Sequence, residues 1–100
     1  MTKLEKDIEA ALVRKVKQRG GQCLKWVCPG WSGVPDRIIL LPGGRIYFVE
    51  TKRPKGGHVS RMQEWWGEQL RHLGFSWTVI RNHEDITWLE LLIKSEEVKR

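Results

Sequence analysis

The chain has few cysteines and no long apolar segment, and these two shortages disfavour disulfide-linked and membrane-spanning proteins. Its two cysteines, Cys23 and Cys28, stand five positions apart, which places them on opposite faces of a strand and disfavours a bridge. No zinc-type cluster accompanies them, so we expect reduced thiols. No stretch approaches the roughly 20 apolar residues of a membrane span, and the charged start MTKLEKDIEA lacks the apolar core of a secretory signal. We therefore expect an intracellular protein with no membrane partner.

The chain is rich in basic residues and in tryptophan. The net charge is +6, from 18 Lys and Arg against 12 Asp and Glu, and there are six tryptophans. An excess of positive charge favours polyanionic partners, above all nucleic acid, although many basic proteins bind none. A length of 100 residues predicts one domain with a single core, spanning residues 1–100.

Hydrophobic periodicity predicts a small α/β domain. The apolar spacing and the turn residues indicate helices over 3–19, 60–73 and from Asn82 onward, and strands over 22–28, 37–41, 45–52 and 75–81. Short joins between the first three strands predict an antiparallel meander, and the long connection through 60–73 lets the fourth strand run parallel. We therefore expect a mixed sheet flanked by helices, with a tail that frays after about residue 94.

The pattern also predicts how the two later helices begin and which side chains they bury. Ser60 and Gln63 have the spacing of a capping box, Gly74 suits the position after a helix, and Asn82 can cap the last helix. The second helix is expected to carry on one side the residues Met62, Trp65, Trp66, Leu70 and Leu73, with the two tryptophans in the core and at an interface. The last helix is expected to turn inward Ile86, Leu89, Leu92 and Ile93.

Three charged residues stand at the ends of two apolar strands in the stretch PDRIILLPGGRIYFVETK. Glu50 and Lys52 are two apart and share a face. A hairpin loop of three residues pairs position 41 with 45 and 36 with 50, which places Asp36 on the same face as Glu50. A loop of two residues pairs 36 with 51 and places Asp36 on the opposite face. Because proline cannot donate a ladder hydrogen bond, Pro42 favours the three-residue loop. In that register Asp36 and Glu50 oppose each other about 5 Å apart.

Two opposed carboxylates repel each other and require a shared proton or a cation. A hard divalent ion such as Mg²⁺ or Mn²⁺ suits oxygen ligands, and Lys52 could polarise a water or stabilise charge on a phosphate. With the basic surface, this indicates phosphodiester hydrolysis. The alternative is structural: Asp36 caps the turn after Pro35, and Glu50 pairs with Lys52 or Arg37 on a solvated sheet end.

Four segments resemble the virus-type replication-repair nuclease (VRR-NUC) domain of the PD-(D/E)xK nuclease superfamily. They are Glu5 with Ile8 in the first helix, GVPDRIIL, the hairpin GGRIYFVETKRP, and GGHVSRMQ before the second helix. The resemblance covers roughly residues 4–90 and implies a restriction-endonuclease-like core of helix, three strands, helix and strand. It implies metal ligation by Asp36, Glu50 and the carbonyl of Thr51, with Lys52 as the catalytic lysine.

The same resemblance implies further site members, a substrate and a setting. Glu5 would be an additional acidic site residue and a further metal ligand, and Gln63 a polar catalytic-site position. Each has an ordinary alternative, since Glu5 can face solvent, with Glu9 as its competitor, and Gln63 can serve only as the cap of Ser60. The implied activity is cleavage of DNA, with four-way (Holliday) junctions and other branched forms as substrates. Stand-alone domains of this kind are typical of bacteriophages, and a phage-encoded protein would act in the cytoplasm of its bacterial host. Related resolvases are homodimers, so the resemblance implies a homodimer.

Several residues beside the motif are candidates for DNA contacts. These are the basic side chains that follow Lys52 and the tryptophan that precedes the motif, namely Arg53, Lys55, His58, Arg61 and Trp31. Core packing or a dimer contact is the alternative for Trp31, and a plain loop position for His58. Two other functions stay open: a non-catalytic nucleic-acid-binding module on the same fold, and a small interaction protein whose charges are structural.

Overall fold

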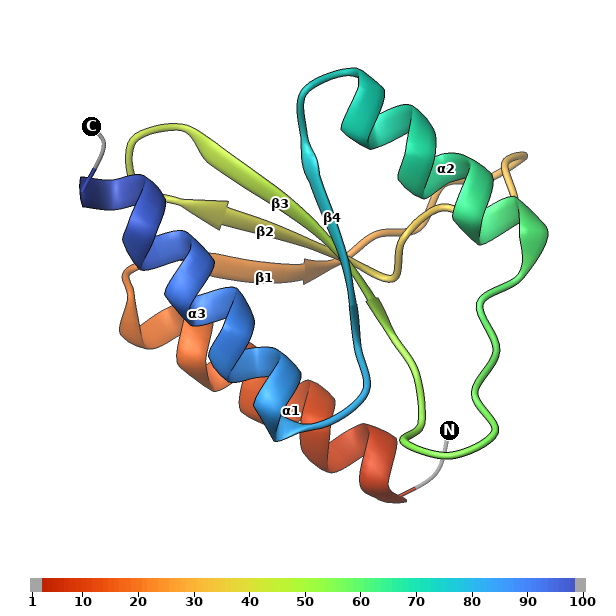
Figure 1. Cartoon of the computed structure of the whole chain (residues 1–100), viewed down its shortest axis with the longest axis horizontal. Helices are drawn as coiled ribbons and strands as arrows, with labels where there is room; N and C mark the ends of the chain where they lie inside the picture. The colour runs from red at the N-terminus through yellow and green to blue at the C-terminus, as the bar shows by residue number, and fades with distance from the viewer. Residues whose placement is uncertain (1–2, 99–100) are drawn as a thin grey trace.

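The computed structural model describes residues 3–98, which form three helices and four strands in the predicted order (Figure 1). The elements are α1 (Lys3–Gln18), β1 (Gln22–Lys25), β2 (Arg37–Leu41), β3 (Arg45–Thr51), α2 (Arg61–His72), β4 (Ser76–Ile80) and α3 (His83–Val98). The expected α/β class is confirmed. None of these helices combines the length and the apolar character needed to cross a membrane.

The four strands form one mixed sheet in the order β1-β2-β3-β4. The first three strands are antiparallel neighbours, and β4 runs parallel to β3 after the crossover through α2, as the connection lengths predicted. Leu41 pairs with Arg45, so the hairpin loop has three residues, and the glycines of this loop both have positive φ. This register confirms the three-residue loop, and it determines which side chains meet at the far end of the hairpin.

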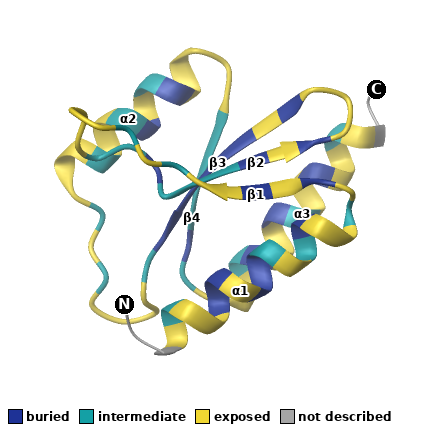
Figure 2. Ribbon diagram, turned by 180° about the vertical axis from the view of Figure 1, so that it is seen from behind, coloured by how far each residue is buried: buried dark blue, intermediate teal, exposed yellow. Residues whose placement is uncertain are grey.

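Helices α1 and α3 lie side by side on one face of the sheet and bury the main core there (Figures 1 and 2). The core consists of apolar side chains from both helices and from the inward positions of the strands, namely Ile8, Ala11, Leu12, Val16, Ile39, Leu41, Tyr47, Val49, Ile80, Ile86, Leu89 and Ile93. Asn82 caps α3 as predicted, because its Oδ1 accepts a hydrogen bond from the Asp85 backbone N–H at 2.9 Å.

Helix α2 packs on the opposite face, where its main contact is with β4. Only Gly67 and Leu70 of this helix are buried. The apolar side predicted for this helix is therefore buried only in part, since Met62, Trp65 and Leu73 are 44%, 45% and 68% exposed. The physical reason is that a helix lying over one edge strand can bury only the narrow stripe that faces that strand.

Gly67 lets α2 approach β4 closely, and this predicts a large cost for one added methyl group. A Cβ at position 67 would lie 2.5 Å from the Cε3 ring carbon of Trp77. Alanine is normally the better helix former by about 1 kcal/mol, yet here we expect Gly67→Ala to lower the unfolding free energy by about 1–3 kcal/mol through overpacking. Urea denaturation measures this. The exposed neighbour Glu68→Ala is the control, and equal stability of the two variants would contradict the close packing.

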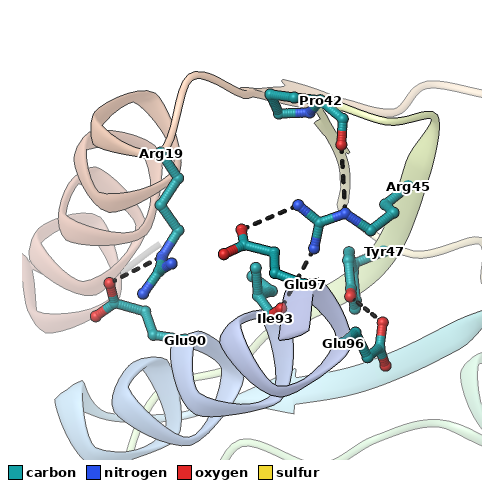
Figure 3. Close-up of polar contacts among 8 residues, drawn as sticks. All are labelled: Arg19, Pro42, Arg45, Tyr47, Glu90, Ile93, Glu96 and Glu97. Carbon is teal, nitrogen blue, oxygen red and sulfur yellow. Dashed lines mark hydrogen bonds and ion pairs between the residues drawn. The ribbon is translucent and has the colours of Figure 1, made fainter. Parts of the chain in front are cut away.

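The last helix continues to Val98, so the expected fraying after about residue 94 is wrong for 94–98, while 99–100 lie outside the described residues. Figure 3 shows the reason. The Arg45 guanidinium donates to the Ile93 carbonyl at 3.3 Å and to Glu97 at 3.0 Å, and the Tyr47 hydroxyl donates to Glu96. These bonds fasten the last turns of α3 to the hairpin.

One apolar position of α3 also differs from expectation. Ile86, Leu89 and Ile93 are buried as predicted, but Leu92 is 39% exposed. Successive helical residues point about 100° apart, so Leu92 cannot face the sheet while Ile93 does.

Candidate functional site

The β2–β3 register places Asp36 and Glu50 at the same level of the sheet. Arg37 is paired with Val49, so the next position along the hairpin sets Asp36 opposite Glu50 on one face. The backbone carbonyl of Asp36 also accepts a hydrogen bond from the Trp26 N–H at 2.9 Å, which continues the ladder from β1. Asp36 is therefore fixed between the ends of β1 and β3, and the predicted proximity of the two carboxylates is confirmed.

The Asp36 carboxylate is oriented by the first residue that follows Glu50. Its Oδ2 accepts hydrogen bonds from the Thr51 backbone N–H at 3.0 Å and from the Thr51 hydroxyl at 3.1 Å. Both donors come from one residue of β3, so the carboxylate position follows from the sheet itself. Because these bonds use one oxygen, Oδ1 is left for other partners.

Glu50 is fully buried beside Asp36, although its side chain carries a carboxyl group. Its Oε1 accepts a hydrogen bond from the Gln63 side-chain amide at 3.0 Å, whereas its Oε2 is buried without a hydrogen-bond partner. Burial, followed by the neighbouring Asp36 carboxylate, raises the Glu50 pKa from its ordinary 4.5 to about 8, and the Lys52 charge offsets part of this. At neutral pH Glu50 therefore holds a proton in most molecules.

A buried carboxyl oxygen without a partner, beside a second carboxylate, is the environment that a divalent cation would satisfy. Hard cations prefer such oxygen ligands, and their charge removes the repulsion between the two acids. Among residues 3–98 no group of three Asp, Glu, His or Cys side chains converges closely enough to hold an ion. The chemistry of Asp36 and Glu50 thus fits Mg²⁺ or Mn²⁺, with further ligands to come from backbone oxygens, water or substrate.

Gln63 has a structural contact and a site contact at the same time. Its Oε1 accepts from the Ser60 backbone N–H at 2.8 Å, and its backbone N–H donates to the Ser60 hydroxyl at 3.1 Å, which completes the predicted capping box. Its amide nitrogen donates to Glu50. The two interpretations of Gln63 are therefore compatible, because the start of α2 lies against the buried glutamate.

In front of Asp36 lies an open pocket of about 390 Å³. Its walls contain Asp36, Thr51 and Lys52 from the hairpin, and Glu5 and Glu9 from α1. The structure thus brings Glu5 to the same pocket as the motif residues. Glu9, its competitor, is nearly buried and forms an ion pair with Arg37 at 2.9 Å, so this carboxylate joins α1 to β2.

The residues predicted to contact DNA lie outside this pocket. Arg53, Lys55 and His58 lie on the loop between β3 and α2, and Arg61 is exposed at the start of α2. Arg53 donates to the Gly56 carbonyl at 3.1 Å, and the Arg81 guanidinium donates to the Gly57 carbonyl, so the loop is held in place. None of these four basic residues lines the pocket of Asp36 and Lys52.

Trp31 lies on the loop before the motif and is 60% exposed. Its ring meets Trp66 of α2 edge to face, with centroids 5.9 Å apart, and the Trp66 indole N–H donates to the Ser32 carbonyl at 3.1 Å. Core packing, one alternative for Trp31, is therefore excluded. The indole remains available to a partner at the outer side of the loop.

Three pocket residues were missed by reading the sequence, namely Lys25, Trp26 and Val27 at the end of β1. Trp26 packs against Phe48 with ring centroids 5.4 Å apart, and Val27 is 78% exposed. Nothing in the QCLKWVC stretch indicates a site. The signal that could have identified these residues is strand pairing, because Lys25 lies opposite Arg37, the neighbour of Asp36.

Solved structures share this fold, and two of them are compared below, although no family model matches the chain. One, described as "VRR_NUC domain", aligns with 88% of this chain and 95% of its own, at a TM-score of 0.82 and 26% identity. A second, described as "VRR_NUC domain protein", aligns with 94% of this chain and 91% of its own, at a TM-score of 0.71 and 16% identity.

A curated phage protein is similar to half of the chain. The protein "Putative nuclease p44" of Acyrthosiphon pisum secondary endosymbiont phage 1 is 52% identical over 50 residues. These residues make up 50% of this chain and 54% of that relative, so the alignment spans about half the length of each.

Proposed function

Because the chain has the VRR-NUC fold over nearly its whole length, as its motifs predicted, we propose that it is a divalent-metal-dependent DNA endonuclease. The observation that carries this proposal is the pair of opposed carboxyl groups: Glu50 is buried with an unpartnered oxygen, and Asp36 lines a pocket that also contains Lys52. A structural pair of acids would gain stability from a partner for that oxygen. A metal-binding pair would be expected to lack one until the ion binds.

The residues that would hold the ion are Asp36 and Glu50, with the Thr51 carbonyl as a further ligand and Glu5 acting directly or through water. When bound, Mg²⁺ or Mn²⁺ would neutralise phosphate charge and lower the pKa of a coordinated water. The Thr51 N–H and hydroxyl keep Asp36 in place, and Gln63 keeps Glu50 in place. The site is therefore organised before substrate arrives.

Lys52 is the catalytic cation in this proposal. It follows Thr51 at the end of β3, its backbone N–H donates to the Ile80 carbonyl at 3.0 Å, and its side chain lines the pocket beside Asp36. From there its ammonium group can orient a water for in-line attack on phosphorus and stabilise the charge that develops on the phosphate oxygens. No covalent intermediate with the protein is needed.

DNA is the proposed substrate, with branched forms such as four-way junctions preferred. The net charge of +6 and the basic side chains of the β3–α2 loop favour phosphate contacts, and exposed Trp31 can stack on a base. We also propose a homodimer, because two-fold symmetry would present two sites to a two-fold substrate. Light scattering that gives twice the 11.7 kDa chain mass supports it, and a monomer at micromolar concentration argues against it.

Incubation with plasmid, linear duplex and synthetic four-way junctions tests the activity, with Mg²⁺, Mn²⁺ or EDTA in parallel. Metal-dependent cleavage that favours the junction supports the full proposal, and equal cleavage of all substrates supports only the nuclease. Binding without cleavage under every condition would favour the non-catalytic binding module.

A pair of variants separates the two contacts of Gln63. Ser60→Ala removes only the cap, so we expect a loss of about 1 kcal/mol in unfolding free energy and cleavage close to wild type. Gln63→Ala removes the cap and the bond to Glu50, and cleavage is expected to fall about tenfold, as for loss of a residue that orients a ligand. Denaturation and single-turnover cleavage measure both effects. Equal cleavage rates of the two variants would show that Gln63 acts only as a capping residue.

A further inference from the structure

Lys25 is the last residue of β1 and lies at the same pocket as Lys52. Lys25 is paired with Arg37 of β2, and Arg37 is paired with Val49, three residues before Lys52 along the chain. Both lysines line the pocket. Lys25 is exposed, whereas the backbone beside it is fixed by the Trp26 N–H bond to the Asp36 carbonyl and by the packing of Trp26 on Phe48.

Two other cations near the pocket, Arg37 and Lys52, each already interact with an acidic side chain. Arg37 forms an ion pair with Glu9 at 2.9 Å and donates to the Cys23 carbonyl at 3.3 Å. Lys52 lies close enough to Glu50 to lower its pKa, against the dominant effect of burial. Lys25, in contrast, has no ion pair within 4.0 Å among residues 3–98. Its positive charge is thus available to a ligand.

We infer that Lys25 binds a backbone phosphate of the substrate strand, next to the phosphate that is cleaved. This inference rests on the proposed DNA substrate but not on the proposed chemistry. A strand that passes over Asp36 and presents one phosphate to Lys52 presents a neighbouring one toward the end of β1. The compact ammonium on a flexible stem suits a single phosphate contact. Lys25 is therefore a binding residue, distinct from the catalytic role of Lys52.

Lys25→Gln tests this role, because it removes the charge and keeps most of the stem. Affinity for a four-way junction, measured in EDTA at several KCl concentrations, is expected to fall about tenfold near 0.1 M salt, with the slope of log affinity against log salt reduced by about 1. With Mg²⁺ present, KM is expected to rise five- to tenfold and kcat to stay within about twofold. Lys25→Arg is expected to restore both binding and KM.

Lys17→Gln is the matched control, an exposed lysine in the last turn of α1 and outside the pocket. If Lys25→Gln and Lys17→Gln give the same affinity and salt slope while wild type cleaves, the inference fails and the nuclease stands. Loss of kcat at unchanged affinity overturns it as well. If wild type cleaves nothing but Lys25→Gln still loses affinity and slope, the phosphate contact stands and the catalytic proposal fails.

Discussion

Replacing Asp36 by asparagine is expected to lower the rate of DNA cleavage about 10³-fold while the fold stays intact. The asparagine side-chain oxygen can still accept the bonds that Asp36 Oδ2 receives from the Thr51 N–H and hydroxyl, at 3.0 and 3.1 Å. What the substitution removes is the negative charge beside Glu50. Lys52→Ala is expected to have an effect of similar size, because it removes the proposed catalytic cation without disturbing the backbone bond of residue 52 to Ile80.

Single-turnover cleavage of a junction with Mg²⁺ or Mn²⁺ measures both losses, and binding in EDTA shows that the variants still recognise DNA. Suitable controls are Asp7→Asn and Lys94→Ala, two positions that do not line the pocket. If Asp36→Asn and Lys52→Ala cleave as fast as these controls, the activity belongs to a contaminant or to another site. The assignment of both residues would then be wrong.

Replacing Glu50 by glutamine is expected to stabilise the metal-free protein at neutral and higher pH. The native pKa of about 8 lies above the ordinary 4.5, so unfolding releases a proton between these values and wild-type stability falls as pH rises through this range. Each pKa unit corresponds to about 1.4 kcal/mol. Glutamine mimics the protonated acid, so we expect a gain of about 3 kcal/mol at pH 7, about 5 kcal/mol above pH 8 and almost none below pH 4.5.

Urea denaturation at pH 4, 7 and 8.5 in EDTA measures the difference, with Asp7→Asn as the control. Divalent ions should stabilise wild type much more than Glu50→Gln, because they favour the ionised acid. Mn²⁺ is expected to stabilise wild type, more at pH 8.5 than at pH 7, and to leave Glu50→Gln nearly unchanged. A Glu50→Gln protein that is less stable than wild type at pH 8.5 without metal would show that Glu50 is not a strained buried acid.

Local sequence rules predicted the elements and the hairpin because these depend on near neighbours. Pro42 and the two glycines after it determine the loop, the loop determines the register, and the register brings Asp36 to Glu50. The capping box of Ser60 and Gln63 was predictable for the same reason. Where the motif residues lie close to strong turn signals, as they do in this hairpin, the amino-acid sequence alone predicts much of the site.

Features that depend on packing between distant segments could not be predicted. Periodicity shows that α2 has an apolar side but not that the helix lies over β4 alone, which leaves Met62 and Trp65 exposed. Likewise, the last turns of α3 depend on Arg45, about 50 positions earlier in the chain. Lys25 joins the pocket only through the pairing of β1 with β2.

Calorimetric titration with Mn²⁺ at pH 7 is the sharpest test of whether Asp36 and Glu50 together bind a divalent ion. We expect saturable binding by wild type that releases close to one proton, seen as a difference in heat between buffers of unlike ionisation enthalpy, because Glu50 must lose its proton. Asp36→Asn should show little or no binding. Absence of saturable heat in wild type, or the same titration curve for wild type and Asp36→Asn, would refute the shared metal site.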